Sequence, residues 1–258
     1  MIKMKNVWGP LLVLLLLLFS WEYAVQMFRI PEWLLPTPSG IFDELITGWS
    51  IVQGHIMPTV LLSISGFFMG SVIGVLVAVF LHLIPFLRQA VYPLLIVSQN
   101  IPIIVLAPLL VIWFGFGYLP KLIVITLVCF FPITVALMDG LRRTGSELLH
   151  YMEMSGATRK QIFLKLEWPH ALPSLFSGLK ISATYSVMGA VISEWLGASK
   201  GLGVYMTLAS SSFKTDRVFV AIFIIVLLSL IFFLIIVLGE RLFVKWRPEE
   251  EKGKHERT

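Results

Sequence analysis

The chain has 258 residues, of which 57% are hydrophobic and 14% are charged, and its formal net charge is +5. Soluble globular domains average roughly 45–50% apolar and about 25% charged residues, so this composition excludes an ordinary soluble protein and indicates an integral membrane protein. The sequence has one cysteine, Cys129, which excludes an intrachain disulfide and a cysteine-cluster metal site.

Mostly apolar stretches of about 20 residues, long enough to cross a hydrocarbon core of ~30 Å, recur along the chain. No alternating strand pattern accompanies them, and we therefore interpret them as helices, which satisfy their own backbone in lipid. The predicted fold is an all-α integral membrane protein, a single transmembrane domain over residues 1–258. Its six or so predicted transmembrane helices are Pro10–Phe28, Val60–Leu83, Ala90–Phe114, Pro120–Met138, Leu172–Leu196 and Val218–Leu238.

The distribution of lysine and arginine predicts that both termini are cytoplasmic. In that topology fourteen of these cations lie inside and five outside, and Lys180 in the fifth span is expected to extend toward the inner surface. Lys3 and Lys5 precede the first span as in a signal peptide, but no convincing cleavage site follows, which favours an uncleaved anchor. The positive charge thus reflects membrane orientation, and no nucleic-acid partner is expected.

Small residues repeat every four positions along the second span, at Gly66, Gly70, Gly74 and Ala78. This spacing places them on one face of a helix and lets a neighbouring backbone approach closely. We interpret the stripe as a helix-packing surface, either within the bundle or between two copies of the chain.

The third span is interrupted by prolines, of which Pro102 follows the polar pair Gln99 and Asn100. A proline inside a helix bends its axis, and amides at mid-membrane are costly unless they face protein or water. Two interpretations stay open: these residues line a pathway, or the amides bond to adjacent helices.

A charged segment of the chain, from about residue 142 to 169, lies between the fourth and fifth spans. Two capping boxes, Thr144 with Glu147 and Thr158 with Gln161, predict two short helices separated by a break at Ser155-Gly156. On composition alone, such a segment could rest on the lipid surface with its cations near anionic headgroups.

This segment also resembles a known motif. The run Ser155-Gly156-Ala157-Thr158-Arg159-Lys160-Gln161, followed by Trp168-Pro169, is similar to the coupling loop of binding-protein-dependent ABC importer permeases, although His150-Tyr151-Met152 stands where that family has Glu-Ala-Ala. Further matches cover nearly the whole chain: Leu35-Pro36-Thr37-Pro38-Ser39, Ile101-Pro102, Ala107-Pro108-Leu109, Trp113-Phe114-Gly115-Phe116-Gly117, Phe131-Pro132-Ile133, Glu194-Trp195-Leu196 and Gly201-Leu202-Gly203.

The resemblance implies a homodimer of permeases in a bacterial cytoplasmic membrane, with two cytoplasmic ATPase subunits and an extracytoplasmic solute-binding protein. The chain has no Gly-Lys-Ser/Thr phosphate loop, so ATP and Mg²⁺ would be used by the partner ATPase, and the chain itself would bind no cofactor. Contact with the ATPase is expected from the coupling residues Glu153, Ser155, Gly156, Ala157, Thr158, Arg159, Lys160, Gln161 and Pro169.

A translocation path is expected at the centre of such a dimer. Its candidate residues are Gln99, Asn100, Pro102, Ser182, Thr184, Tyr185 and Ser186, although hydroxyls can also bond back to their own helix. Glu194 is expected to contact the binding protein or to gate the mouth of the path, and a salt bridge with Lys200 is the structural alternative.

The resemblance also narrows the substrate. The nearest branch of the family serves sulfonates, taurine, nitrate and pyrimidine precursors of thiamine such as hydroxymethylpyrimidine, and Ser98–Ile104 looks most like the pyrimidine-precursor members. Neither a metal site nor catalysis is expected, because the five histidines are scattered and no nucleophile, base and acid cluster together. A secondary transporter is less favoured, because the apolar spans hold few acidic residues.

Overall fold

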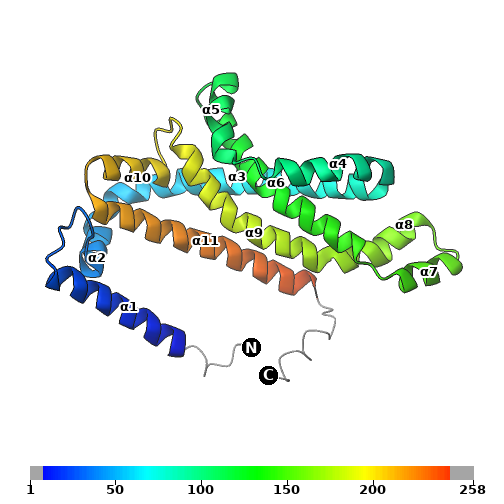
Figure 1. Ribbon diagram of the computed structural model, residues 1–258, viewed down its shortest axis with the longest axis horizontal. Coiled ribbons are helices and arrows are strands. Elements are labelled where there is room, and N and C mark those ends of the chain that lie inside the picture. Colours follow the sequence, from blue (N-terminus) through cyan, green and yellow to red (C-terminus); the bar gives the residue numbers. More distant parts are fainter. Residues whose placement is uncertain (1–7, 245–258) are drawn as a thin grey trace.

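The computed structural model describes residues 8–244, which form helices joined by turns without a strand among them (Figure 1). Lys3, Lys5 and the polar C-terminal tail lie outside the described residues. The helices are α1 (Trp8–Met27), α2 (Pro38–Thr47), α3 (Trp49–Leu83), α4 (Pro85–Ser98), α5 (Ile103–Phe114), α6 (Tyr118–Arg142), α7 (Ser146–Met154), α8 (Arg159–Ile162), the π-helical η2 (Phe163–Glu167), α9 (Trp168–Glu194), α10 (Leu202–Ser211) and α11 (Thr215–Phe243).

Within residues 8–244, five helices are long and apolar enough to cross a membrane: α1, α3, α6, α11 and the continuous helix Arg159–Glu194, formed by α8, η2 and α9. They confirm the predicted all-α membrane fold. The largest boundary differences are in the fifth span, where the continuous helix begins at Arg159, thirteen positions before the expected Leu172, and in α3, which begins at Trp49, eleven positions before the expected Val60. In both, the helix begins before the apolar run does, because polar residues at the membrane surface can be part of the same helix. Hydropathy does not detect such residues as part of the span.

The expected third span, Ala90–Phe114, is two helices instead of one kinked helix. α4 ends at Ser98, a turn covers residues 99–102, and Pro102 is the N-cap of α5. A proline disfavours helical geometry in the residue before it and has no N–H to donate, so the chain ends one helix and starts another. Pro93 and Pro108, by contrast, lie inside helices.

The centre of the bundle is formed by α3, α6 and α9, which pack along one another. Ile133, Leu137 and Met138 on α6 are fully buried there against Leu81 of α3. The small-residue stripe of α3 lies in this interface, since a Cβ atom added at Gly70 would lie 2.6 Å from the Cβ of Cys129. The close approach predicted for the stripe is therefore made with α6 of the same chain.

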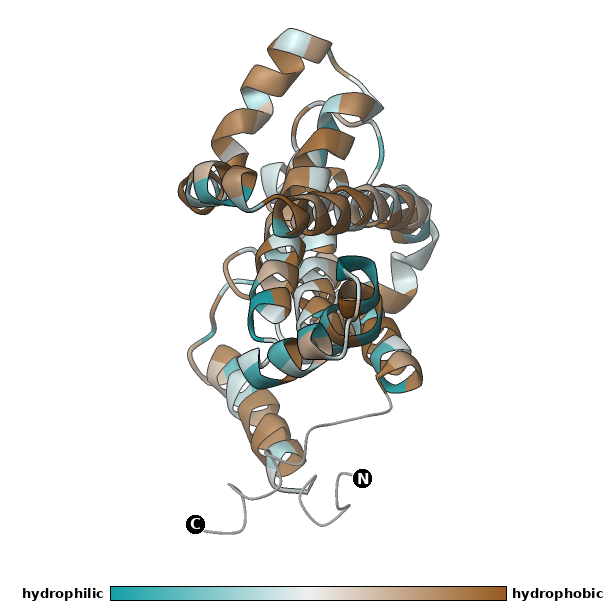
Figure 2. Ribbon diagram, turned by 90° about the vertical axis from the view of Figure 1, so that its right-hand side faces the viewer, coloured by the Kyte–Doolittle hydropathy of each residue, from teal (hydrophilic) through white to brown (hydrophobic). Residues whose placement is uncertain are grey.

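The two ends of the bundle differ in character. α2 and α10 lie at one end, on the left in Figure 1, and α7 and α8 lie at the opposite end. Figure 2 views the molecule from the α7–α8 end and shows hydrophilic residues gathered there, while the long helices are mostly hydrophobic. A polar cap on an apolar bundle is the arrangement expected where the chain leaves the membrane.

Candidate functional site

The first candidate site is the charged segment between α6 and α9. Gly156 ends α7 with a φ of 76°, a left-handed conformation that glycine adopts without strain. The N–H of Gly156 donates to the carbonyl of Glu153 and the N–H of Ala157 to that of Met152, both at 3.0 Å. This pattern is a Schellman motif, which stops α7 and redirects the chain.

The helix that follows has the capping box predicted from the sequence. The backbone N–H of Gln161 donates to Oγ1 of Thr158 at 3.3 Å, and the N–H of Thr158 donates to the side chain of Gln161 at 2.8 Å. The other predicted box is wrong: Thr144 donates its hydroxyl back to the carbonyl of Leu141, and Gly145 is the N-cap of α7 without a side-chain cap. The hydroxyl of Thr144 therefore bonds to the preceding turn and does not cap α7.

Most of the expected coupling residues lie on the surface of this segment. Exposed side chains and backbone positions include Glu153, Ser155, Gly156, Thr158, Arg159, Lys160 and Gln161, and Ala157 is half-buried. On the opposite face, Ile162 is only 2% exposed and fixes α8 to the bundle. The segment therefore presents a polar surface on a firmly attached helix.

Pro169, the last of the expected coupling residues, lies within the continuous helix Arg159–Glu194. The preceding turn is the π-helical η2, in which the N–H of Trp168 donates to the carbonyl of Phe163, five residues back. A proline has no N–H for the carbonyl four residues back and its ring crowds that carbonyl, so a wider turn accommodates Pro169 without breaking the helix.

The second candidate site is a cavity of about 440 Å³ between the α4–α5 turn, α6 and α9. Four of the expected path residues line it: Gln99, Asn100, Pro102 and Tyr185. Residues that were not among the expected path residues complete the wall: Ile101, Ile103, Val124, Val128, Phe131, Pro132, Met188, Gly189 and Ile192. No charged residue is among those lining it.

The other expected path residues do not line this cavity. Ser182 is buried and donates to the carbonyl of Cys129 on α6 at 2.8 Å. Ser186 and Thr184 donate to carbonyls of their own helix, those of Ala183 and Lys180. The hydroxyls of Thr184 and Ser186 thus bond back to their own helix, the alternative noted above, whereas that of Ser182 joins α9 to α6.

Glu194 occupies a buried junction at the α2–α10 end. The carboxylate accepts hydrogen bonds from the hydroxyl of Thr59 at 2.7 Å and from the N–H of Gly203 at 2.8 Å, and its residue is 2% exposed. Thr59 also accepts from the N–H of Leu202. Glu194 therefore joins α9 to α3 and α10, and these bonds take the place of the salt bridge with Lys200 suggested as the structural alternative.

Two cross-helix polar pairs could not be foreseen from the sequence. Lys180 on α9 pairs with Glu240 on α11 at 3.1 Å, and His82 on α3 contacts Glu167 of η2 at 3.0 Å. Both contacts join residues that are far apart in the chain, and no short motif marks them. Lys180 was expected to extend toward the inner surface, and its partner Glu240 lies in the last turn of α11.

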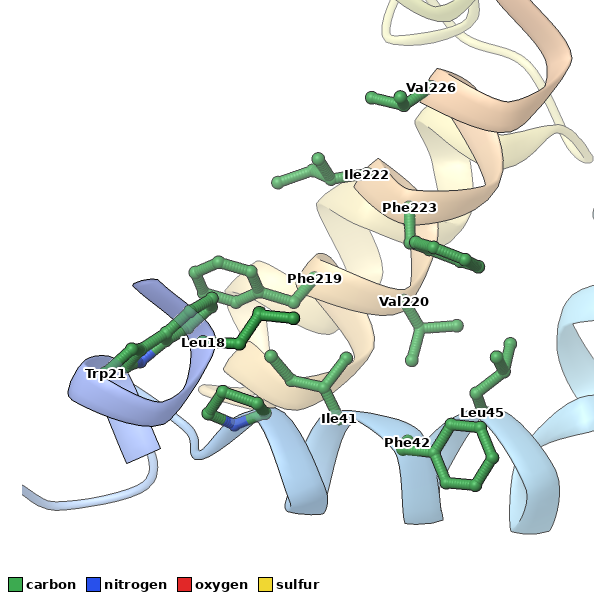
Figure 3. Close-up of a pocket in the computed structure, with 11 residues that line it drawn as sticks. Leu18, Trp21, Ile41, Phe42, Leu45, Phe219, Val220, Ile222, Phe223 and Val226 are labelled. Carbon is green, nitrogen blue, oxygen red and sulfur yellow. The ribbon is translucent and has the colours of Figure 1, made fainter. Parts of the chain in front are cut away.

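A second hollow, of about 450 Å³, lies between α1, α2 and α11 (Figure 3). Its walls are aliphatic and aromatic, with Trp21 and Phe219 side by side at one end, their ring centroids 5.4 Å apart. Walls without an amide or hydroxyl side chain suit hydrocarbon and not a polar solute. We therefore place the candidate solute site in the cavity that contains Gln99 and Asn100.

The sequence is similar to a known protein family over most of its length. Residues 70–244 match the family model described as the binding-protein-dependent transport system inner membrane component. The chain is 37% identical to the formylaminopyrimidine transport permease of Halalkalibacterium halodurans, over 93% of this chain and 96% of that protein. It is 33% identical to the riboflavin transport system permease of Chloroflexus aurantiacus, over 92% and 90%.

A more distant relative is also a transport permease. Identity to the taurine transport system permease of Escherichia coli is 25%, over 92% of this chain and 88% of that protein. Among solved structures, the inward-facing methionine ABC transporter MetNI has a chain that superposes with a TM-score of 0.59 at 22% identity, covering 74% of this chain and 96% of the other, which supports the fold. The chain thus belongs to the family of inner-membrane components of binding-protein-dependent transport systems.

Proposed function

We propose that this chain is the permease of an ATP-driven importer for a neutral nitrogen heterocycle, a pyrimidine precursor of thiamine such as hydroxymethylpyrimidine or formylaminopyrimidine. Two copies would form the path, with two ATPase subunits below and a solute-binding protein outside. The α7–α8 end and both termini would face the cytoplasm, as the distribution of lysine and arginine favours.

The chemistry of the cavity carries this proposal. Gln99 offers an amide donor and acceptor, and Asn100, whose amide nitrogen donates to the carbonyl of Ile96 at 2.9 Å, offers its side-chain oxygen as an acceptor. These groups match the amino group and ring nitrogens of a pyrimidine, and Phe131 and Tyr185 offer aromatic surfaces. The volume of about 440 Å³ lies within the usual range for small-molecule sites, roughly 300–1,000 Å³. Relatives named for formylaminopyrimidine and riboflavin, both nitrogen heterocycles, support the same substrate class.

The rival substrates are sulfonates, taurine and nitrate, and all of them carry a negatively charged group. A buried anion needs a cation or several N–H donors to offset its desolvation. The cavity wall contains no lysine or arginine. The lack of cationic side chains in this wall favours a neutral heterocycle as the substrate. The identity of 25% to a taurine permease is lower than the 37% to the formylaminopyrimidine permease, which also favours the heterocycle.

The driving force would come from the ATPase through α7 and α8. In this proposal ATP and Mg²⁺ bind the ATPase, and the exposed surface around Gly156 and Lys160 seats against it. Because α8, η2 and α9 form one continuous helix, a push on α8 would reach the cavity wall at Tyr185 along that helix. Glu194, which joins three helices, would hold the outer mouth closed until the solute-binding protein docks.

Reconstitution of the complete transporter in proteoliposomes tests the substrate. We expect ATP-dependent uptake of labelled hydroxymethylpyrimidine or formylaminopyrimidine, and Asn100→Leu should reduce it by about tenfold, the effect of one lost hydrogen bond of about 1.4 kcal/mol. Gln53→Leu, which removes an exposed amide of α3 away from the cavity, is the matched control. Uptake of taurine without uptake of either pyrimidine would refute the assignment.

A further inference from the structure

The contact between His82 and Glu167 joins two elements that the chain itself does not connect. His82 lies in the last turn of α3, and Glu167 is the final residue of η2, between the coupling segment and α9. The Nε2 atom of the ring lies 3.0 Å from Oε2 of the carboxylate, and the two side chains are 12% and 11% exposed. Both groups are thus largely removed from solvent at the α7–α8 end.

The surroundings of the two ring nitrogens determine which tautomer of His82 fits the contact with Glu167. With its proton on Nε2, His82 donates to Glu167 and leaves Nδ1 as a bare acceptor. Nδ1 is buried and has no partner among the described residues, so a proton there would be an unsatisfied donor. The contact is therefore a directed hydrogen bond to a carboxylate, a kind stronger than one between neutral groups.

Aromatic packing holds this hydrogen bond in place. The ring of Phe163, in the first position of η2, lies 6.1 Å from that of His82 and 6.0 Å from that of Trp168. Phe163 and Trp168 also pack on the core cluster that contains Leu81 and Leu137. The hydrogen bond is therefore held by packed aromatic rings where η2 contacts the end of α3.

We propose that His82 and Glu167 are positioning residues that transmit motion of the coupling segment to α3. This inference rests on the proposed coupling function of that segment. Motion of α8 reaches α9 through the continuous helix, but α3 belongs to another part of the chain and receives motion only through side-chain contacts, such as the bond between His82 and Glu167 and the packing around Leu81. Because the stripe at Gly70 locks α3 to α6, a pull on Glu167 moves α3 and α6 together with α9.

The reconstituted transporter provides the test, with solute imported per ATP hydrolysed as the readout. His82→Leu should lower this ratio at least about fivefold, the lower range of coupling between sites, while ATP hydrolysis continues. His82→Gln should restore it, because the amide nitrogen of glutamine can take the place of Nε2. Tyr92→Phe is the matched control, since it removes a cross-helix bond to Asp139 at 3.2 Å between α4 and α6.

An unchanged ratio in His82→Leu would overturn the proposal, even if the variant melts at a lower temperature. If His82→Leu does not fold, the double variant His82→Leu/Glu167→Leu replaces the pair by apolar groups and leaves no carboxylate unpaired. Its ratio should also be low, and a normal ratio would overturn the proposal. Wild-type protein that shows no ATP-driven uptake would instead count against the coupling function itself.

Discussion

The packing of α3 on α6 leads to a quantitative prediction for Gly70→Ala. The new Cβ would lie 2.6 Å from the Cβ of Cys129 and 2.8 Å from the carbonyl oxygen of Thr126, well inside the roughly 3.5 Å at which carbon atoms pack best. Neither atom can rotate away, so the two helices must separate. Overpacking of this kind costs about 1–3 kcal/mol, which exceeds the gain of roughly 1 kcal/mol that alanine brings to a helix.

Gly54→Ala is the matched control, because it lies in the same helix and its Cβ would meet nothing within 4 Å. For a chain of this size 1 kcal/mol corresponds to about 2–4 °C in melting temperature. Thermal unfolding of the purified protein should therefore show Gly70→Ala below wild type by up to about 8 °C and Gly54→Ala at or above it. A Gly70→Ala protein as stable as Gly54→Ala would refute the close approach of α3 to α6.

Three further predictions concern the coupling segment and the polar pairs. Gly156→Val forces a branched residue to a φ of 76°, at a cost of about 1–2 kcal/mol, so uptake should fail although the bundle still folds, with a melting temperature no more than about 8 °C below wild type; normal uptake would contradict this. Lys180→Met leaves the carboxylate of Glu240 unpaired and should destabilise the protein by on the order of 3 kcal/mol in thermal unfolding, and the double variant with Glu240→Met should recover most of it. Glu194→Leu removes the acceptor for Thr59 and for the N–H of Gly203, and limited proteolysis should then cut the α9–α10 loop faster than in wild type; equal rates would show that these bonds do not hold the loop.

The sequence was sufficient where short-range rules decide the structure. Apolar length defined the membrane-spanning helices, the four-residue spacing of small residues marked the face of α3 at Gly70, and the pair Thr158 and Gln161 marked the start of α8. Each of these features depends on residues within one or two turns of a helix. Gly156 belongs to the same class, because a helix end with a left-handed residue favours glycine.

Long-range packing decided the features that the sequence did not reveal. The prolines predicted a bend in the third span, but whether Pro102 bends one helix or separates two depends on what the flanking helices contact. Pro169 lies inside a continuous helix because the π-helical turn before it lets the helix continue, and the sequence did not indicate that turn. His82 and Glu167 are in contact because the end of α3 lies against η2 in the folded bundle. No local sequence pattern encodes this contact.

Crosslinking of the coupling segment to the ATPase tests the central claim most directly. The one native cysteine, Cys129, is buried, so a cysteine introduced by Lys160→Cys would be the reactive thiol of this chain. We predict that a short bifunctional reagent joins it to the ATPase in the assembled transporter, while Lys200→Cys, an exposed position between α9 and α10, gives no such product. A crosslink to the ATPase from Lys200→Cys, with none from Lys160→Cys, would contradict the account.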